Sequence, residues 1–159
     1  LINKKEKSMP SETDLIKLYS GKILQMAADP IYRERLSEPD ASVTKRSPLC
    51  GSAITVDINV KNGIITHYGQ DVRACALGQA SSTIIGKAII GRSLKEVSKA
   101  YEELREMLTN NGPTPSQPFD ALYMLQPASE YKNRHASILL AIEATLAAFQ
   151  QIADGDKLF

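Results

Sequence analysis

The sequence predicts an α+β fold in which a three-stranded antiparallel meander packs against about four to five helices. Two observations indicate this class. Apolar residues alternate with polar ones from Ala53 to Val60, and they recur at three- and four-residue spacing in several other segments. A period of two is typical of a half-buried strand, and a period near 3.6 is typical of an amphipathic helix. In a chain of 159 residues this indicates one domain. We expect it to span residues 11–153, after an extension (1–10) and before a tail (154–159).

The strands are predicted from alternation and from turn residues. The alternating stretch 53–60 leads to Asn62-Gly63, a pair that favours a type I′ turn because both residues tolerate positive φ. Residues 64–68 then form the returning strand, and after Gly69 the stretch 71–74 is expected to add a short third strand. The polar segment 31–48 is predicted to be an irregular connection.

The helices are predicted from apolar stripes and capping residues. Ser11 and Asp14 have the spacing of a capping box, and so do Ser93 and Glu96, each before a periodic segment. Gly91 suits the position that follows a helix. Residues 110–118 are rich in breakers and predict a loop. The expected helices cover residues 12–28, 76–90, a segment beginning after Ser93, a short turn at 119–126, and 130–152.

The charge balance and the apolar runs exclude some classes of partner. Nineteen basic residues face eighteen acidic ones, so there is no basic footprint for a nucleic acid and no polybasic membrane patch. The longest apolar run, 138–148, is interrupted by Glu143 and Thr145 and is too short to cross a bilayer. The first nine residues are charged rather than signal-like. We therefore expect a cytoplasmic protein without a nucleic-acid or membrane partner.

Two cysteines are the first candidates for chemistry. Cys50 precedes the first predicted strand, and Cys75 lies where a strand meets a helix. Free N–H groups and the dipole at a helix N-terminus favour the thiolate, the form that binds metal and attacks electrophiles. An antiparallel meander can bring both cysteines to one edge, as half of a metal site. The alternative is that each is a small buried apolar residue, since no C-x-x-C motif is present.

The two histidines carry different expectations. His135 lies in the first turns of the last predicted helix, where a neutral imidazole is a good zinc or iron ligand. The alternative is a helix-face histidine that makes one hydrogen bond. His67, on the second strand, is interpreted as a structural or surface residue. Hydrolase, P-loop and dinucleotide-binding motifs are absent from the sequence, and no third residue can be named for Cys75–His135 catalysis. We therefore assign no catalytic residue.

Three segments, in order, resemble the IscU/NifU/SufU family of iron–sulfur cluster assembly scaffolds, including the NifU N-terminal-like domain. Residues 48–60 (PLCGSAITVDINV) resemble the segment around the first ligand cysteine. Residues 75–96 (CALGQASSTIIGKAIIGRSLKE) resemble the second, in which a cysteine ends a strand and a small-residue helix follows. Residues 135–139 (HASIL) resemble the third, usually His-Cys-Ser-Ile-Leu. The resemblance implies a SufE/NifU-like fold.

The resemblance also implies a metal site with two positions changed. Cys50, Cys75 and His135 match family ligands and are the predicted metal-binding residues. Ser52 stands where the family usually has an aspartate, and Ala136 stands where the third cysteine is expected. Both are predicted to line the site. This chain therefore resembles a divergent member that lacks the third cysteine.

The function implied by the resemblance is that of a scaffold or carrier rather than an enzyme. It would bind iron or a [2Fe–2S] cluster, weakly or not at all given the changed positions, and pass it to apo-acceptor proteins. One alternative is a zinc-binding sulfur acceptor of the SufU kind, and another is a degenerate paralogue without metal. The implied partners are a cysteine desulfurase and the acceptors. A water, an exogenous thiol or a second subunit in a homo-oligomer could complete the metal's ligands.

Overall fold

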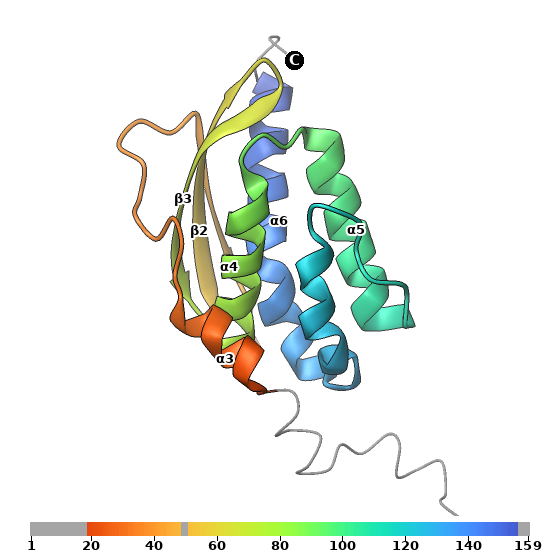
Figure 1. The fold of residues 1–159 in the computed structure, drawn as a ribbon. Helices are drawn as coiled ribbons and strands as arrows, with labels where there is room; N and C mark the ends of the chain where they lie inside the picture. The colour runs from red at the N-terminus through yellow and green to blue at the C-terminus, as the bar shows by residue number, and fades with distance from the viewer. Residues whose placement is uncertain (1–18, 49–50, 156–159) are drawn as a thin grey trace, which may run out of the picture.

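The structure is a computed structural model that describes residues 19–48 and 51–155. The predicted extension, the tail after Gly155 and Cys50 lie outside these residues. A small sheet and the helices on one of its faces make up the described chain (Figure 1). In chain order the elements are α3 (Gly21–Ala28), β1 (Ala41–Arg46), β2 (Ala53–Lys61), β3 (Ile64–Arg73), α4 (Ala76–Ile89), α5 (Leu94–Asn110), the 3₁₀ helix η1 (Asp120–Glu130) and α6 (Lys132–Gly155).

The sheet is the predicted three-stranded antiparallel sheet, in the order β1-β2-β3. The hairpin between β2 and β3 turns at Asn62 and Gly63, whose φ angles are 54° and 77°. The sequence-based prediction of this turn is therefore confirmed, because a type I′ turn needs positive φ at both central residues. The inner face of β2 carries Ile54, Val56 and Ile58, which are fully buried.

The prediction of the third strand is wrong. β3 runs without a break to Arg73, and Gly69 lies within it, opposite Asp57 of β2. Gly69 is needed for packing rather than for a turn, because a Cβ there would lie 2.3 Å from the carbonyl oxygen of Glu34. The third strand is instead β1, inside the segment predicted to be irregular. β1 buries only Ala41 fully and the rest of it is half-buried or exposed, so its sequence shows little alternation.

The helices cover the inner face of the sheet. In Figure 1, α4 and α6 lie next to the sheet, and α5 packs on the other side of α6. α6 is long and apolar enough to cross a membrane by length and composition, but 61% of its most apolar window is buried within the protein. It is the core helix of this fold, and its buried residues include Ile138, Ile142 and Phe149.

The predicted helix ends agree with the structure at most positions. Ser93 and Glu96 form both hydrogen bonds of the capping box, and Gly91 has a φ of 87°. η1 and α6 continue to Glu130 and Gly155, beyond their predicted ends. The first helix, predicted from residue 12, begins at Gly21 among the described residues, because Tyr19 and Ser20 are not helical.

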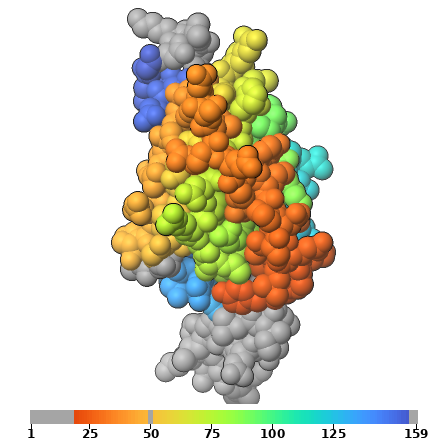
Figure 2. Space-filling model, turned by 90° about the vertical axis from the view of Figure 1, so that its left-hand side faces the viewer, coloured from red at the N-terminus to blue at the C-terminus, as the bar shows by residue number. Residues whose placement is uncertain are grey.

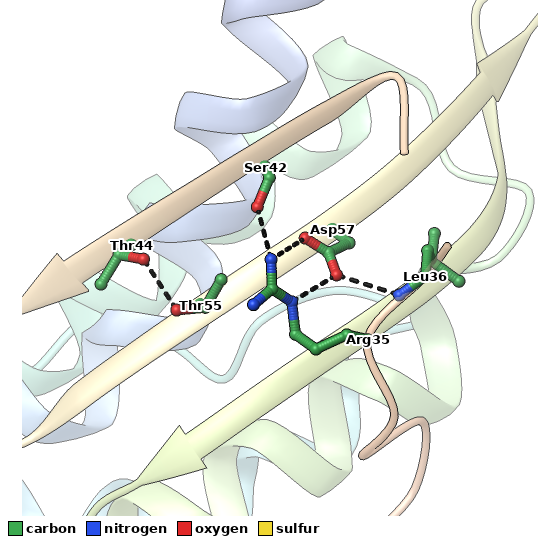
Figure 3. A network of polar contacts seen from close by, with 6 residues as sticks. All are labelled: Arg35, Leu36, Ser42, Thr44, Thr55 and Asp57. Carbon is green, nitrogen blue, oxygen red and sulfur yellow. Dashed lines mark hydrogen bonds and ion pairs between the residues drawn. The ribbon is translucent and has the colours of Figure 1, made fainter. Parts of the chain in front are cut away.

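The segment 30–40 covers part of the sheet that the helices leave open. The Gln70 N–H of the edge strand β3 donates to the Tyr32 carbonyl oxygen at 2.8 Å. On the outer face, the Arg35 guanidinium donates twice to the carboxylate of Asp57, at 2.6 and 3.1 Å, and the Leu36 N–H donates to it at 3.0 Å (Figure 3). Figure 2 shows this segment in orange across that side of the molecule. Covering an edge strand in this way prevents it from pairing with another chain.

Candidate metal and sulfur site

Cys75 is the N-cap residue of α4, directly after β3. Its backbone is extended, with φ −66° and ψ 173°, so the chain changes direction at this residue. The side chain is half-buried, and the thiol is free. The predicted placement at a strand–helix junction is thus what the structure shows, and it puts the sulfur beside the unpaired N–H groups that begin a helix.

Two serine hydroxyls form a chain of contacts that ends at the sulfur. The Ser137 Oγ of α6 lies 3.4 Å from the Cys75 Sγ, and the Ser52 Oγ lies 3.2 Å from the Ser137 Oγ. Ser137 is 1% exposed and Ser52 is 4% exposed. A thiolate can only accept, so when Cys75 is ionised Ser137 donates to it and Ser52 donates to Ser137. The Ser137 hydroxyl therefore links Ser52 to the sulfur of Cys75.

The approach of α6 to α4 depends on a glycine. A Cβ on Gly78 would lie 2.5 Å from the Ser137 Oγ and 2.6 Å from the Cβ of Ala74. One turn further along α4, the Ser81 hydroxyl donates to the Ile138 carbonyl oxygen at 2.7 Å. The small residues that the sequence places in this helix therefore set the distance between Ser137 and the sulfur.

The surroundings of Cys75 favour its thiolate. Half-burial of the side chain opposes ionisation and would raise the thiol pKa. The Ser137 hydroxyl, the backbone N–H groups of Gly78 and Leu77, and the positive charge of Arg134 act the other way and outweigh it. The pKa of Cys75 is consequently below that of an ordinary cysteine, which makes it a better nucleophile and ligand at neutral pH.

His135 is buried and faces a different set of partners. Its Nε2 lies 2.9 Å from the Ala128 carbonyl oxygen and 3.1 Å from that of Ser129. Carbonyl oxygens only accept, so Nε2 carries the proton and donates, which leaves Nδ1 as the only nitrogen of the neutral ring that can bind a metal. Residues two apart on a helix do not face each other, so His135 is not part of the Ser137–Cys75 contact.

The remaining predicted positions add no further donor among the described residues. Ala136 is half-buried and carries only a methyl group. Cys50 lies outside the described residues, although the backbone on either side of it is held together: the Ser47 N–H donates to the Ser52 carbonyl oxygen and the Gly51 N–H donates to that of Ser47. His67 is exposed and its Nδ1 lies 3.1 Å from the Thr66 hydroxyl, in agreement with the surface interpretation.

The donor set of the described residues is incomplete for a metal. Within residues 19–48 and 51–155 there is no group of three His, Cys, Asp or Glu side chains that can hold an ion. A structural zinc site or a cluster usually has four protein ligands, mainly thiolates and imidazoles. Cys75 and His135 alone do not fit such a group, and a complete site needs Cys50 and a ligand from elsewhere.

Ser137 is the site residue that sequence reasoning missed. It lies in the quoted segment 135–139, but its contact with Cys75 depends on the distance between α4 and α6. A signal was present in the glycine at position 78 and the serine at 81, which indicate a close helix–helix contact, although not its partner.

Comparisons with known proteins agree with the fold and the segment order. The NifU-like N terminal domain family matches residues 18–137. The iron-sulfur cluster assembly scaffold protein IscU of Thermotoga maritima is 27% identical over 90 residues, which are 57% of this chain and 63% of that protein. The match thus spans less than two thirds of that relative.

Solved structures are similar over most of the chain. The N-terminal part of a nitrogen-fixing NifU-like protein from Brucella abortus has a TM-score of 0.87 at 37% identity, covering 89% of this chain and 98% of that one. An iron-sulfur cluster assembly scaffold protein for the SUF system from Fervidobacterium islandicum has a TM-score of 0.74 at 17% identity, covering 83% and 96%, and shows a shared fold. With its family match over more than half its length, this chain belongs to the NifU-like N-terminal domain family.

Proposed function

We propose that this protein is a non-enzymatic scaffold or carrier that holds iron or a [2Fe–2S] cluster as cargo and passes it to acceptor proteins. The observation that carries the proposal is the half-buried Cys75 at the start of α4, where its thiolate is favoured, in a chain of the NifU-like family. A cytoplasmic protein of this kind would receive sulfur from a cysteine desulfurase.

Each candidate residue would have its own role in holding the cargo. Cys75 supplies one thiolate and Cys50 a second, and His135 supplies Nδ1 once its ring is held by the two carbonyl oxygens. The Ser137 hydroxyl donates to the Cys75 sulfur. Hydrogen bonds to ligating sulfurs tune a cluster's reduction potential. Ala136 leaves an open position, which suits cargo that must be released, and a second subunit or a small thiol would fill it.

Anaerobic reconstitution with ferrous iron and sulfide tests the proposal. Wild-type protein is expected to develop visible absorbance, and Cys75→Ala and Cys50→Ala are expected to lose it. The two histidines give a matched pair: His135→Ala should reduce the absorbance and speed its decay, whereas His67→Ala, at an exposed position of β3, should not. Wild-type protein that stays colourless at every ratio of iron and sulfide would refute the proposal.

A second candidate function is that of a zinc-binding sulfur acceptor, favoured by the activated thiol of Cys75. In that case the Cys75 thiolate attacks the outer sulfur of a desulfurase persulfide, a new S–S bond forms on Cys75, and the desulfurase thiolate leaves. Mass spectrometry after reaction with a desulfurase detects the added sulfur. If neither thiol is labelled, this candidate is removed.

A third candidate is a paralogue that binds the assembly proteins without metal. The incomplete donor set of the described residues favours it. Elemental analysis of freshly purified protein separates the three: iron supports the scaffold, zinc the sulfur acceptor, and no metal the paralogue.

A further inference from the structure

Two arginines flank the start of β2, at the end of the sheet that leads to Cys75. Arg46 ends β1 and Arg73 ends β3, and both are paired in register with Ala53, at the start of β2. Directly paired residues project from the same face, so both arginines extend from the outer face of the sheet. Strands are spaced at ~4.8 Å, which places their Cα atoms about 10 Å apart. Both side chains are exposed.

A third arginine approaches the sulfur from the helical side. Arg134 lies in the first turn of α6, three residues before Ser137, and is half-buried. Its positive charge acts on Cys75. Arg73 thus precedes Cys75 by two residues at the end of β3, and Arg134 acts on its sulfur from α6. We call Arg46, Arg73 and Arg134 the arginine rim.

The arginines of the rim have no carboxylate partner among the described residues, unlike three other arginines of the chain. Arg35, Arg92 and Arg105 each form an ion pair. Among the residues that the structure describes, no ion pair involves a member of the rim. In a chain with a net charge of only +1, three guanidinium groups without an ion pair at the end of the sheet that leads to Cys75 concentrate positive potential there.

We propose that the arginine rim docks an acidic segment of a partner protein and brings that partner's sulfur or metal-binding group to Cys75. What the partner delivers or receives rests on the proposed function. Guanidinium groups match carboxylates in shape and charge and can bind them through two hydrogen bonds. In a polyproline II segment, which has three residues per turn, two carboxylates three residues apart lie on the same side about 9 Å apart, close to the separation of the two strand arginines.

The surface favours a protein segment over a small anion. Two hollows of the described residues lie away from the arginine rim. One is between β1, α5 and α6, and the other is beneath residues 30–36. The rim instead spans an open strand face and a helix start. An acidic segment can contact each arginine at once, whereas a small anion on this open face would be held by the guanidinium groups alone.

The experiment measures how fast Cys75 exchanges with a charged peptide disulfide. Protein with Cys50→Ser, so that Cys75 is the sole thiol, is mixed with a short peptide whose single cysteine carries thionitrobenzoate and is flanked by glutamates. The Cys75 thiolate attacks the peptide sulfur, a protein–peptide disulfide forms, and coloured thionitrobenzoate leaves. The same peptide with glutamines in place of glutamates is the uncharged control.

At low ionic strength the glutamate peptide is expected to react about tenfold faster than the glutamine peptide, and salt should remove the difference. Arg46→Glu with Arg73→Glu should abolish or reverse the preference. The control Lys61→Glu with Lys95→Glu changes the net charge by the same amount at exposed positions on β2 and α5. This variant should keep most of the preference for the glutamate peptide. Circular dichroism and thermal unfolding establish that each variant is folded.

Three results would overturn the proposal: equal rates for the two peptides, equal losses in both double variants, or full suppression by millimolar free sulfate at constant ionic strength. The last would assign the rim to small anions. Iron and sulfide reconstitution needs no acidic partner, so its failure with the peptide preference intact refutes only the proposed function. Successful reconstitution without a preference for the glutamate peptide refutes only the proposal about the arginine rim.

Discussion

Replacing Gly78 by alanine tests whether the contact between α4 and α6 is as close as the structure shows. An added Cβ would lie 2.5 Å from the Ser137 Oγ and 2.6 Å from the Cβ of Ala74, both closer than real Cβ contacts. Neither neighbour is the end of a long flexible side chain. Ser137 is buried on α6, and Ala74 is fixed between β3 and α4. Something in the backbone must therefore move.

The expected cost follows from two opposing effects. Alanine is favoured over glycine within a helix by about 1 kcal/mol. Overpacking a well-packed site costs about 1–3 kcal/mol, and two rigid overlaps argue for the upper end. The net loss in the free energy of unfolding is thus about 2 kcal/mol, which for a domain of this size lowers Tm by about 4–8 °C.

The control is the same substitution where space is open. Gly21 is the first residue of α3, and a Cβ there meets nothing within 4 Å. Gly21→Ala is expected to leave Tm unchanged or to raise it slightly. Urea and thermal unfolding of both variants measure the difference. A Gly78→Ala protein as stable as the wild type would show that α4 and α6 are not in this contact and would refute the reasoning.

Three further changes have defined outcomes. Ser137→Ala removes a hydroxyl that favours the Cys75 thiolate, so in a Cys50→Ser background the midpoint of alkylation rate against pH should rise; an unchanged midpoint would contradict the contact. Burial opposes ionisation of Asp57, but the Arg35 guanidinium and other donors outweigh it and hold the carboxyl pKa below its ordinary 3.8. This contribution to stability is present above 3.8 and is lost as pH falls through the lower folded pKa. Asp57→Asn should therefore lower stability at neutral pH and flatten its acid dependence in urea titrations, and an unaltered curve would argue against the pair. Ser93→Ala removes the N-cap hydrogen bond of α5 and should cost about 1 kcal/mol in the same assay, with no loss counting against the capping box.

The parts of the fold that were predictable are those whose signal is local. The Asn62-Gly63 turn and the Ser93–Glu96 capping box depend on the backbone freedom and hydrogen bonds of neighbouring residues, and both are present. β1 was missed because its pairing with β2 stabilises it more than its own apolar residues do. The strand from residue 64 was expected to end before Gly69, because the carbonyl oxygen of Glu34, which leaves no room for a side chain at Gly69, comes from a distant segment.

The site was predictable to the same extent. Cys75 and His135 could be proposed because the sequence places one at a strand–helix junction and the other in a segment that resembles a family motif. The hydrogen bonds of His135 to the carbonyl oxygens at 128 and 129 depend on how η1 runs into α6, which no periodicity indicates. The link from Ser52 through Ser137 to Cys75 joins three segments far apart in the chain, so it follows only from the packed structure.

Ser137 contributes both to the candidate site and to the core. Its hydroxyl contacts the sulfur, and its position fills the space that Gly78 leaves open. Ala136 is one residue away but only half-buried, and it takes part in neither contact. On the proposed function, a missing third thiolate would therefore carry little structural cost, while Cys75 keeps the hydroxyl, the helix N–H groups and the nearby arginine that favour its ionised form.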